Sequence, residues 1–144
     1  ISGDKEDIDY HVYKTDDGCL RAVMLNTDWT KAGNVKKIKL HYEKFEIPIE
    51  IKEGMMTQVL FKGGAAVIFT TPNTIVDNLV VENQKAAFKA GGVDNSIIEV
   101  VGLNTIKSIS IDGNNKNISG KKSEKLNINF GEKWSNKNFV VTFK

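Results

Sequence analysis

The alternating segment of residues 38–51 constrains the fold more than any other part of the chain. Its apolar positions, which lie on both sides of the polar step Glu43-Lys44, are Ile38, Leu40, Tyr42, Phe45, Ile47, Ile49 and Ile51. A period of two residues is typical of a strand with one buried face. Two such runs joined by a short polar step therefore predict an antiparallel hairpin.

The polar residues of this segment predict the register of the hairpin. If Tyr42 and Phe45 close the turn, the favourable pairs across the two strands are His41–Glu46 and Lys37–Glu50. Such pairs stabilise an antiparallel sheet when their members lie directly opposite each other. The segment contains no residues arranged for chemistry, so it predicts architecture and no function.

Short apolar segments separated by turns fill the rest of the chain. Besides the hairpin, the candidate strands are residues 10–14, 19–25, 55–61, 65–69, 75–81, 96–101, 106–111, 126–130 and 139–143. Residues 83–90 fit either a short helix or a strand, and the strand is favoured. About ten short strands at this spacing predict an all-β fold, an antiparallel β-sandwich. No helical repeat is long enough to supply the crossovers of a parallel sheet.

The length of the chain predicts a single domain. It has 144 residues, which is enough to bury a substantial core. Residues 1–9 are acidic and mixed in character, so we expect a linker or frayed terminus there. Residues 10–144 are expected to form one β-sandwich domain.

Charge and hydropathy exclude two classes of partner. The net charge is +2, and Arg21 is the only arginine. Proteins that bind nucleic acid concentrate Lys and Arg more strongly, and they use arginine forks to bind phosphates and bases. No apolar run approaches the roughly 20 residues of a membrane span. We therefore expect neither a nucleic-acid partner nor a membrane span.

The chain offers few metal ligands. Cys19 is the only cysteine, which excludes an internal disulfide and a cysteine-rich zinc site, and we expect it to be a small buried side chain. Residues 16–18 and 112–115 carry the oxygen ligands that calcium takes, but both are also ordinary turn sequences and the EF-hand spacing is absent. We expect no cofactor and no metal site, with calcium at these turns as the open alternative.

Catalytic motifs are also missing. The two imidazoles belong to His11, which no motif surrounds, and His41, which falls on the polar face of a predicted strand. The glycine pairs at 63–64 and 91–92 lack the strand-to-helix context of a phosphate-binding loop. Neither a nucleophile elbow nor a His-Glu-x-x-His segment occurs. We expect a protein that is not an enzyme.

Two tryptophans are the sharpest candidates for function, because each lies in a polar loop and not in an apolar run. Sugar rings stack their flat C–H faces on aromatic rings, while their hydroxyls bond to Asp, Asn and Lys side chains. The candidate ligand-binding residues are Trp134, Trp29, Asp28, Lys133 and Asn136. The alternative is that each indole folds back and closes an open end of the sandwich.

Lysine clusters provide a second candidate surface. They lie at residues 36–39 and 121–125, where solvated strand and loop faces are the ordinary explanation. If these lysines are functional, an anionic polysaccharide fits them better than DNA does, because arginine is nearly absent.

The segment of residues 21–29, Arg-Ala-Val-Met-Leu-Asn-Thr-Asp-Trp, resembles part of the C-terminal accessory β-sandwich domains of bacterial polysaccharide-active enzymes. Residues 47–54 resemble the strand and glycine turn that follow in those domains, so the resemblance covers roughly the first half of the chain. It implies a domain that packs against or extends a catalytic module and in some cases binds glycans. It also implies that Asp28 and Trp29 are residues that fix the loop.

The interpretation that best joins these observations is a non-catalytic carbohydrate-binding accessory module of a secreted or cell-surface bacterial polysaccharide-degrading enzyme. Its expected partners are a polysaccharide or oligosaccharide, including acidic ones, and a neighbouring catalytic domain in the parent chain. The alternative is a purely structural β-sandwich domain that stabilises that catalytic module. The alternative predicts buried tryptophans and an exposed apolar face for the contact between domains.

Overall fold

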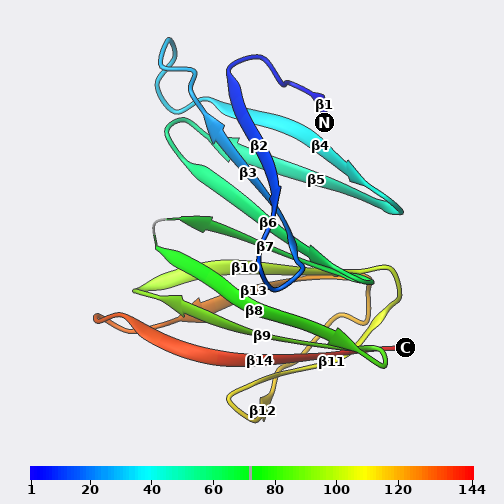
Figure 1. Cartoon of the computed structure of the whole chain (residues 1–144). Coiled ribbons are helices and arrows are strands. Elements are labelled where there is room, and N and C mark those ends of the chain that lie inside the picture. The colour runs from blue at the N-terminus through cyan, green and yellow to red at the C-terminus, as the bar shows by residue number, and fades with distance from the viewer. Residues whose placement is uncertain (72) are drawn as a thin grey trace.

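The computed structural model describes residues 1–71 and 73–144, and this part of the chain consists of strands and turns without a helix (Figure 1). The fourteen strands are β1 (Ser2–Gly3), β2 (Ile8–Lys14), β3 (Leu20–Asn26), β4 (Val35–Tyr42), β5 (Phe45–Lys52), β6 (Met56–Lys62), β7 (Ala65–Thr71), β8 (Thr74–Glu82), β9 (Lys85–Gly92), β10 (Asn95–Gly102), β11 (Ile106–Ile111), β12 (Asn114–Asn115), β13 (Ser123–Asn129) and β14 (Ser135–Phe143). The described residues include no helix long and apolar enough to cross a bilayer.

The strands form three antiparallel sheets stacked in layers (Figure 1). The central sheet has six strands in the order β13-β10-β7-β6-β3-β2. The hairpin sheet, β1-β4-β5, packs on one of its faces, and the outer sheet, β12-β11-β14-β9-β8, packs on the other. The expected all-β antiparallel sandwich is therefore confirmed, with a third layer that the sequence pattern did not predict.

Two hydrophobic cores lie on opposite faces of the central sheet. The larger core joins the central and outer sheets and includes the stacked rings of Phe88 and Phe139, whose centroids are 4.8 Å apart. The smaller core lies under the hairpin sheet, where Phe61 contacts the rings of Tyr42 and Phe45 at centroid distances of 4.8 and 5.6 Å. The alternating apolar positions of β4 and β5 supply the upper half of this smaller core.

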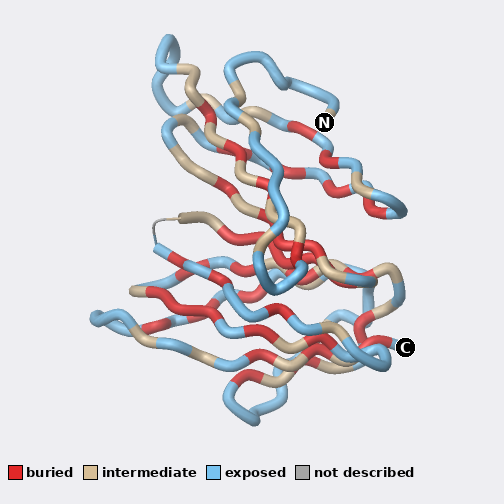
Figure 2. Tube along the Cα trace, in the orientation of Figure 1, coloured by how far each residue is buried: buried red, intermediate tan, exposed pale blue. Residues whose placement is uncertain are grey.

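Strands β6 and β7 are buried on both faces because they lie between the two cores (Figure 2). Val59 and Phe61 contribute to the smaller core, while Leu60 between them contributes to the larger one. Burial on both faces explains why residues 59–61 and 65–69 are continuous apolar runs that do not alternate. The central strands therefore hold the two outer layers together.

The predicted hairpin register is confirmed. Tyr42 pairs with Phe45, and the same register places His41 opposite Glu46 and Lys37 opposite Glu50. The ambiguous residues 83–90 form a turn and most of β9, as favoured. Cys19 is buried as expected, and burial raises the pKa of its thiol.

The N-terminal residues contribute to the fold instead of only leading into it. In the segment 1–9, expected to be a linker or frayed terminus, Ser2 pairs with Lys39 at the edge of β4. Ile1 packs against the smaller core, and β2 already begins at Ile8.

The double burial of β6 predicts that two adjacent positions are both costly to truncate. We expect Leu60→Ala to lower the free energy of unfolding by about 2–5 kcal/mol and Phe61→Ala by about 3–5 kcal/mol, since each opens a cavity in a different core. The control is Ile97→Ala, whose 58 % exposed side chain should cost no more than about 0.5 kcal/mol. Urea unfolding measures all three, and a small effect at either position 60 or 61 would contradict the three-layer packing.

Candidate functional site

Trp134 lies on the short loop that joins β13 to β14, and this loop is anchored at both ends. The backbone N–H of Asp94 donates to the carbonyl of Gly131 at 2.7 Å, and the N–H of Phe130 donates to the carbonyl of Asp94 at 2.8 Å. The Ser135 hydroxyl donates to the Phe130 carbonyl at 2.6 Å. These bonds hold the loop beside the turn between β9 and β10, so that Trp134 is positioned by the ends of two strands.

The Trp134 indole lies against the backbone of Gly91 in β9. A Cβ atom at Gly91 would lie 2.8 Å from the Cζ2 and Nε1 atoms of Trp134 and 2.6 Å from the Oδ1 atom of Asn136. Only glycine leaves room for this approach. The indole remains 48 % exposed, so one side of the ring packs on the protein while the ring stays accessible to solvent.

Polar side chains surround the indole on the outer face of the outer sheet. Cross-strand pairing aligns Ile75, Gly91 and Asn136 in one row, and it aligns Asp77 and Lys89 in a row two residues along. Trp134 and these residues line a shallow cavity of about 210 Å³. We call this surface the Trp134 face; its residues are Ile75, Asp77, Lys89, Gly91, Trp134 and Asn136.

The Trp134 face combines a flat aromatic surface with hydrogen-bonding groups of both kinds. The Asp77 carboxylate accepts, the Lys89 ammonium donates, and the Asn136 amide does both. Asp77 also lies 3.5 Å from the Arg21 guanidinium of the central sheet, and Arg21 itself donates to Gln58 at 2.7 Å. These contacts connect the carboxylate to the central sheet.

Trp29 lies in a different loop, between β3 and β4, at a distance from the loop that carries Trp134 (Figure 1). Its indole lies against Gly54, where an added Cβ would lie 3.1 Å from Cζ3 of the ring, and Trp29 is 65 % exposed. Neither tryptophan is therefore buried as a closure for an open end of the sandwich. The two indoles belong to separate surfaces.

Asp28 holds the Trp29 loop in place. Its carboxylate accepts from the backbone N–H of Thr30 at 3.1 Å and from the Thr30 hydroxyl at 2.5 Å, and it pairs with Lys36 at 3.2 Å. The hydrogen bonds from Thr30 and the charge of Lys36 hold the pKa of Asp28 below its usual value. The fully buried Asn26 also supports this loop, because its amide donates to the Asn34 side chain and to the Ile51 carbonyl, each at 2.9 Å.

The structure thus brings only some of the predicted site residues together. Trp134 and Asn136 meet at Gly91, and Lys133 lies exposed in the same loop. Trp29 and Asp28 share the other loop, where Asp28 contacts protein groups. Sequence reasoning missed Gly91, Asp77 and Lys89, since their proximity to Trp134 depends on the register of β8, β9 and β14, which no local pattern specifies.

The candidate imidazoles lie at the surface. His11 bonds to the Asp9 carboxylate at 2.9 Å, with both side chains more than half exposed. His41 bonds to the Ser2 hydroxyl at 3.0 Å and lies 3.7 Å from Glu46. In residues 1–71 and 73–144, no group of three or more His, Cys, Asp or Glu side chains could hold a metal ion.

The lysine cluster of β4 is engaged in ion pairs across the hairpin sheet and its neighbouring loop. Lys36 pairs with Asp28, Lys37 lies 4.0 Å from Glu50, and Lys39 lies 3.7 Å from Glu46. The Lys37 and Lys39 pairs are exposed and contribute little to stability, but all three pairs reduce the positive charge that this strand presents to an anionic partner.

Comparison with known proteins found no relatives: no family model matches the chain, no curated protein does, and no solved structure does.

The Asp28 contacts predict a pH-dependent contribution to stability. Because its folded-state pKa is lowered, the carboxylate stabilises the fold above the unfolded-state pKa of about 3.9, and this contribution is lost as the pH falls through the lower folded-state value. We expect wild type to be more stable than Asp28→Asn at pH 7 and this advantage to shrink below about pH 4. Urea unfolding at a series of pH values measures it, with Asp16→Asn as an exposed control, and a difference that does not change with pH would contradict the prediction.

The contact at Gly91 predicts that one methyl group displaces the Trp134 indole. In a Trp29→Phe background, where Trp134 is the only tryptophan, we expect Gly91→Ala to increase the quenching of indole fluorescence by iodide. The control is Gly64→Ala, where an added Cβ meets no atom closer than 3.9 Å. Equal quenching in both variants would show that the indole does not rest on Gly91.

Proposed function

We propose that this domain binds carbohydrate without catalysis, through the Trp134 face. The observation that carries the proposal is the half-exposed Trp134 indole, held against the Gly91 backbone beside Asn136. An aromatic ring fixed in this way loses little conformational freedom when a sugar ring stacks on it. Asp77 and Lys89 lie on the same sheet face, where they can bond to sugar hydroxyls.

The wider biological setting is also part of the proposal. The resemblance of residues 21–29 to accessory domains of bacterial polysaccharide-active enzymes supports a secreted or cell-surface module that accompanies a catalytic domain. In this setting the domain holds the polymer while the neighbouring domain acts on it. The exposed positions of both tryptophans favour this proposal over a purely structural domain, which would need them buried.

Retention on polysaccharide gels tests the proposal. We expect Trp134→Ala to abolish the retardation of the protein in native gels that contain the recognised polysaccharide, and Asn136→Ala to weaken it, while the melting temperature stays unchanged. Trp29→Ala is the matched control, since it removes another exposed indole, from a separate loop. A panel of neutral and acidic polymers identifies the ligand, and retention that survives both tryptophan substitutions would refute binding by ring stacking.

A further inference from the structure

The hairpin sheet covers only part of the central sheet. Its strands lie over the half of that sheet that includes β3, β6 and β7, as the smaller core shows. Beyond β5, the same face of the central sheet continues onto β10 and β13, where Ile97 is 58 % exposed and Glu99 and Val101 are half-buried. The central sheet therefore extends beyond the edge of the hairpin sheet that covers it.

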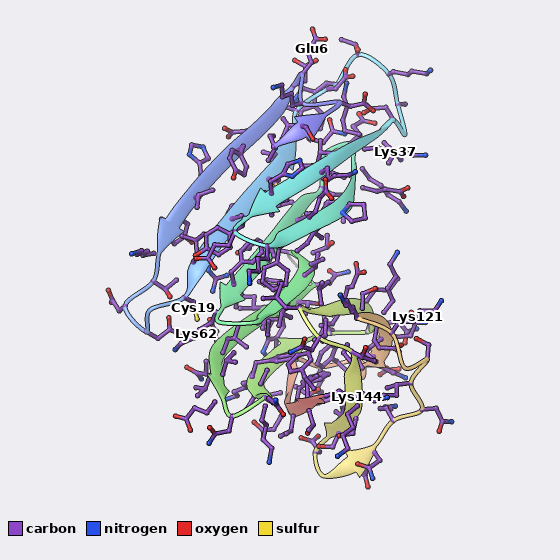
Figure 3. All side chains as sticks on the ribbon, turned by 90° about the vertical axis from the view of Figure 1, so that its right-hand side faces the viewer. Glu6, Cys19, Lys37, Lys62, Lys121 and Lys144 are labelled. Atoms are coloured by element: carbon purple, nitrogen blue, oxygen red, sulfur yellow. The ribbon has the colours of Figure 1, made fainter. Side chains whose placement is uncertain are left out.

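A groove follows this boundary. Two adjoining cavities of about 460 and 300 Å³ share Pro48 of β5 and Glu99 of β10. We call the combined feature the β5–β10 groove; β5 forms its wall, and its floor includes Thr70, Ile97, Glu99, Val101 and Lys125. In Figure 3, Lys37 of the hairpin sheet and Lys121 of the loop before β13 both lie on the right-hand side of the molecule.

The wall of the groove is an unpaired strand edge. Among the residues that the structure describes, β5 pairs with β4 alone. Tyr42 and Phe45 close a two-residue hairpin, so they exchange both ladder hydrogen bonds, and hydrogen-bonded positions recur at every second residue from there. The backbone groups of Glu46, Pro48 and Glu50 therefore point away from β4, toward the groove.

Pro48 is consistent with a position on the unpaired side of β5, and it limits what this edge can bind. Proline has no N–H, so it is tolerated in a strand only where the N–H would point to an unpaired edge. It protects the middle of the edge from indiscriminate strand addition. The outward N–H and C=O groups of Glu46 and Glu50, on either side of Pro48, remain available.

The floor of the groove carries one carboxylate, Glu99, with apolar neighbours along its own strand. The groove is also lined by other charged side chains, namely Glu46, Glu50, Lys37, Lys44, Lys52, Lys122 and Lys125. Glu99 lies between Ile68 of β7 and Lys125 of β13 in the ladder, with Ile97 and Val101 two residues away on the same face. Burial raises the pKa of Glu99, and the charge of Lys125 only partly offsets this effect. A cation placed above Glu99 would therefore be attracted to a charge that water solvates poorly.

We propose that the β5–β10 groove binds an extended polypeptide segment of a partner protein, which adds to the free edge of β5 as a fourth strand of the hairpin sheet. The added strand would cover β10 and complete the upper layer. Its recognised pattern is apolar, any residue, Lys or Arg, any residue, apolar, so that the apolar residues lie over Ile97 and Val101 and the cation over Glu99. This proposal does not depend on carbohydrate binding at the Trp134 face.

The groove is less suited to a glycan than to a polypeptide. Its aromatic lining residues, Phe45 and Phe69, are almost completely buried, so they offer no ring face on which sugars could stack. A polypeptide can instead add to an exposed sheet edge, where backbone hydrogen bonds give affinity and pockets for alternate side chains give specificity.

Titration with a synthetic peptide tests the proposal. The probe is the capped peptide Thr-Val-Thr-Lys-Thr-Val-Thr, whose palindromic sequence allows either strand direction, and its twin carries Glu in place of Lys. With the ¹⁵N-labelled chain and up to about 1 mM peptide, we expect shifts of the Glu46 and Glu50 amides, slower hydrogen exchange at both, and binding that is at least fivefold tighter for the Lys peptide.

Substitutions in the groove test the charge contact at Glu99 and the backbone pairing along β5 separately. Glu99→Gln should weaken binding of the Lys peptide about fivefold and tighten binding of the Glu twin, because it removes the attraction to the first and the repulsion of the second. Glu82→Gln, a substitution of an exposed residue at the end of β8, should change neither. Glu50→Pro removes an outward N–H without breaking a bond to β4 and should weaken both peptides. Glu50→Gln, which keeps that N–H, is its control, and the melting temperature verifies folding of each variant.

Three results of the peptide titrations would overturn the proposal. They are the absence of amide shifts in β5 at the highest peptide concentration, equal affinity for the two peptides, and unchanged binding to Glu50→Pro. Groove shifts produced by an oligosaccharide instead of the peptide would assign the groove to carbohydrate and would equally refute it. Loss of polysaccharide retention in Trp134→Ala leaves these readouts unaffected, so the two proposals fail independently.

Discussion

The structure depends on the burial of β6 and β7 on both faces. Val59 and Phe61 face the hairpin sheet, and Leu60 between them faces the outer sheet, so two cores meet back to back across one layer. Without either outer layer, one face of these strands would be exposed to water, at a cost proportional to the apolar area exposed. Each outer sheet is therefore needed to cover one face of β6 and β7. Either core alone is small enough to belong to an ordinary two-sheet sandwich.

The unequal widths of the layers create the surfaces that are available for function. The hairpin sheet has three strands and the central sheet has six, so the cover ends at β5 and leaves the β10 face partly open. On the opposite side of the molecule, the outer sheet turns its polar face, with Trp134 at one end, to solvent. The two proposed sites thus lie on different layers, where a polymer and a polypeptide could be held at the same time.

Much of the local structure could be predicted from the sequence, because it depends on patterns a few residues long. Residues 38–51 predicted both strands and their register, and the polar step at Glu43-Lys44 placed the turn. The third layer could not be predicted, because a continuous apolar run such as residues 65–69 fits a strand in an ordinary sandwich core as well as one buried between two layers. The tryptophan loops were recognised by their polar neighbours, but their separation on two surfaces was not.

The sequence by itself determined the class of fold, the strands and the hairpin, since period-two alternation and turn residues act within one segment of chain. Only the tertiary structure decided which residues meet at a candidate site. Trp134 rests on Gly91 because the register of β9 against β14 places them side by side, and Glu99 lies beside the edge of β5 because the hairpin sheet is too narrow to cover it. Both juxtapositions join residues far apart in the chain, and they depend on how whole sheets pair and pack.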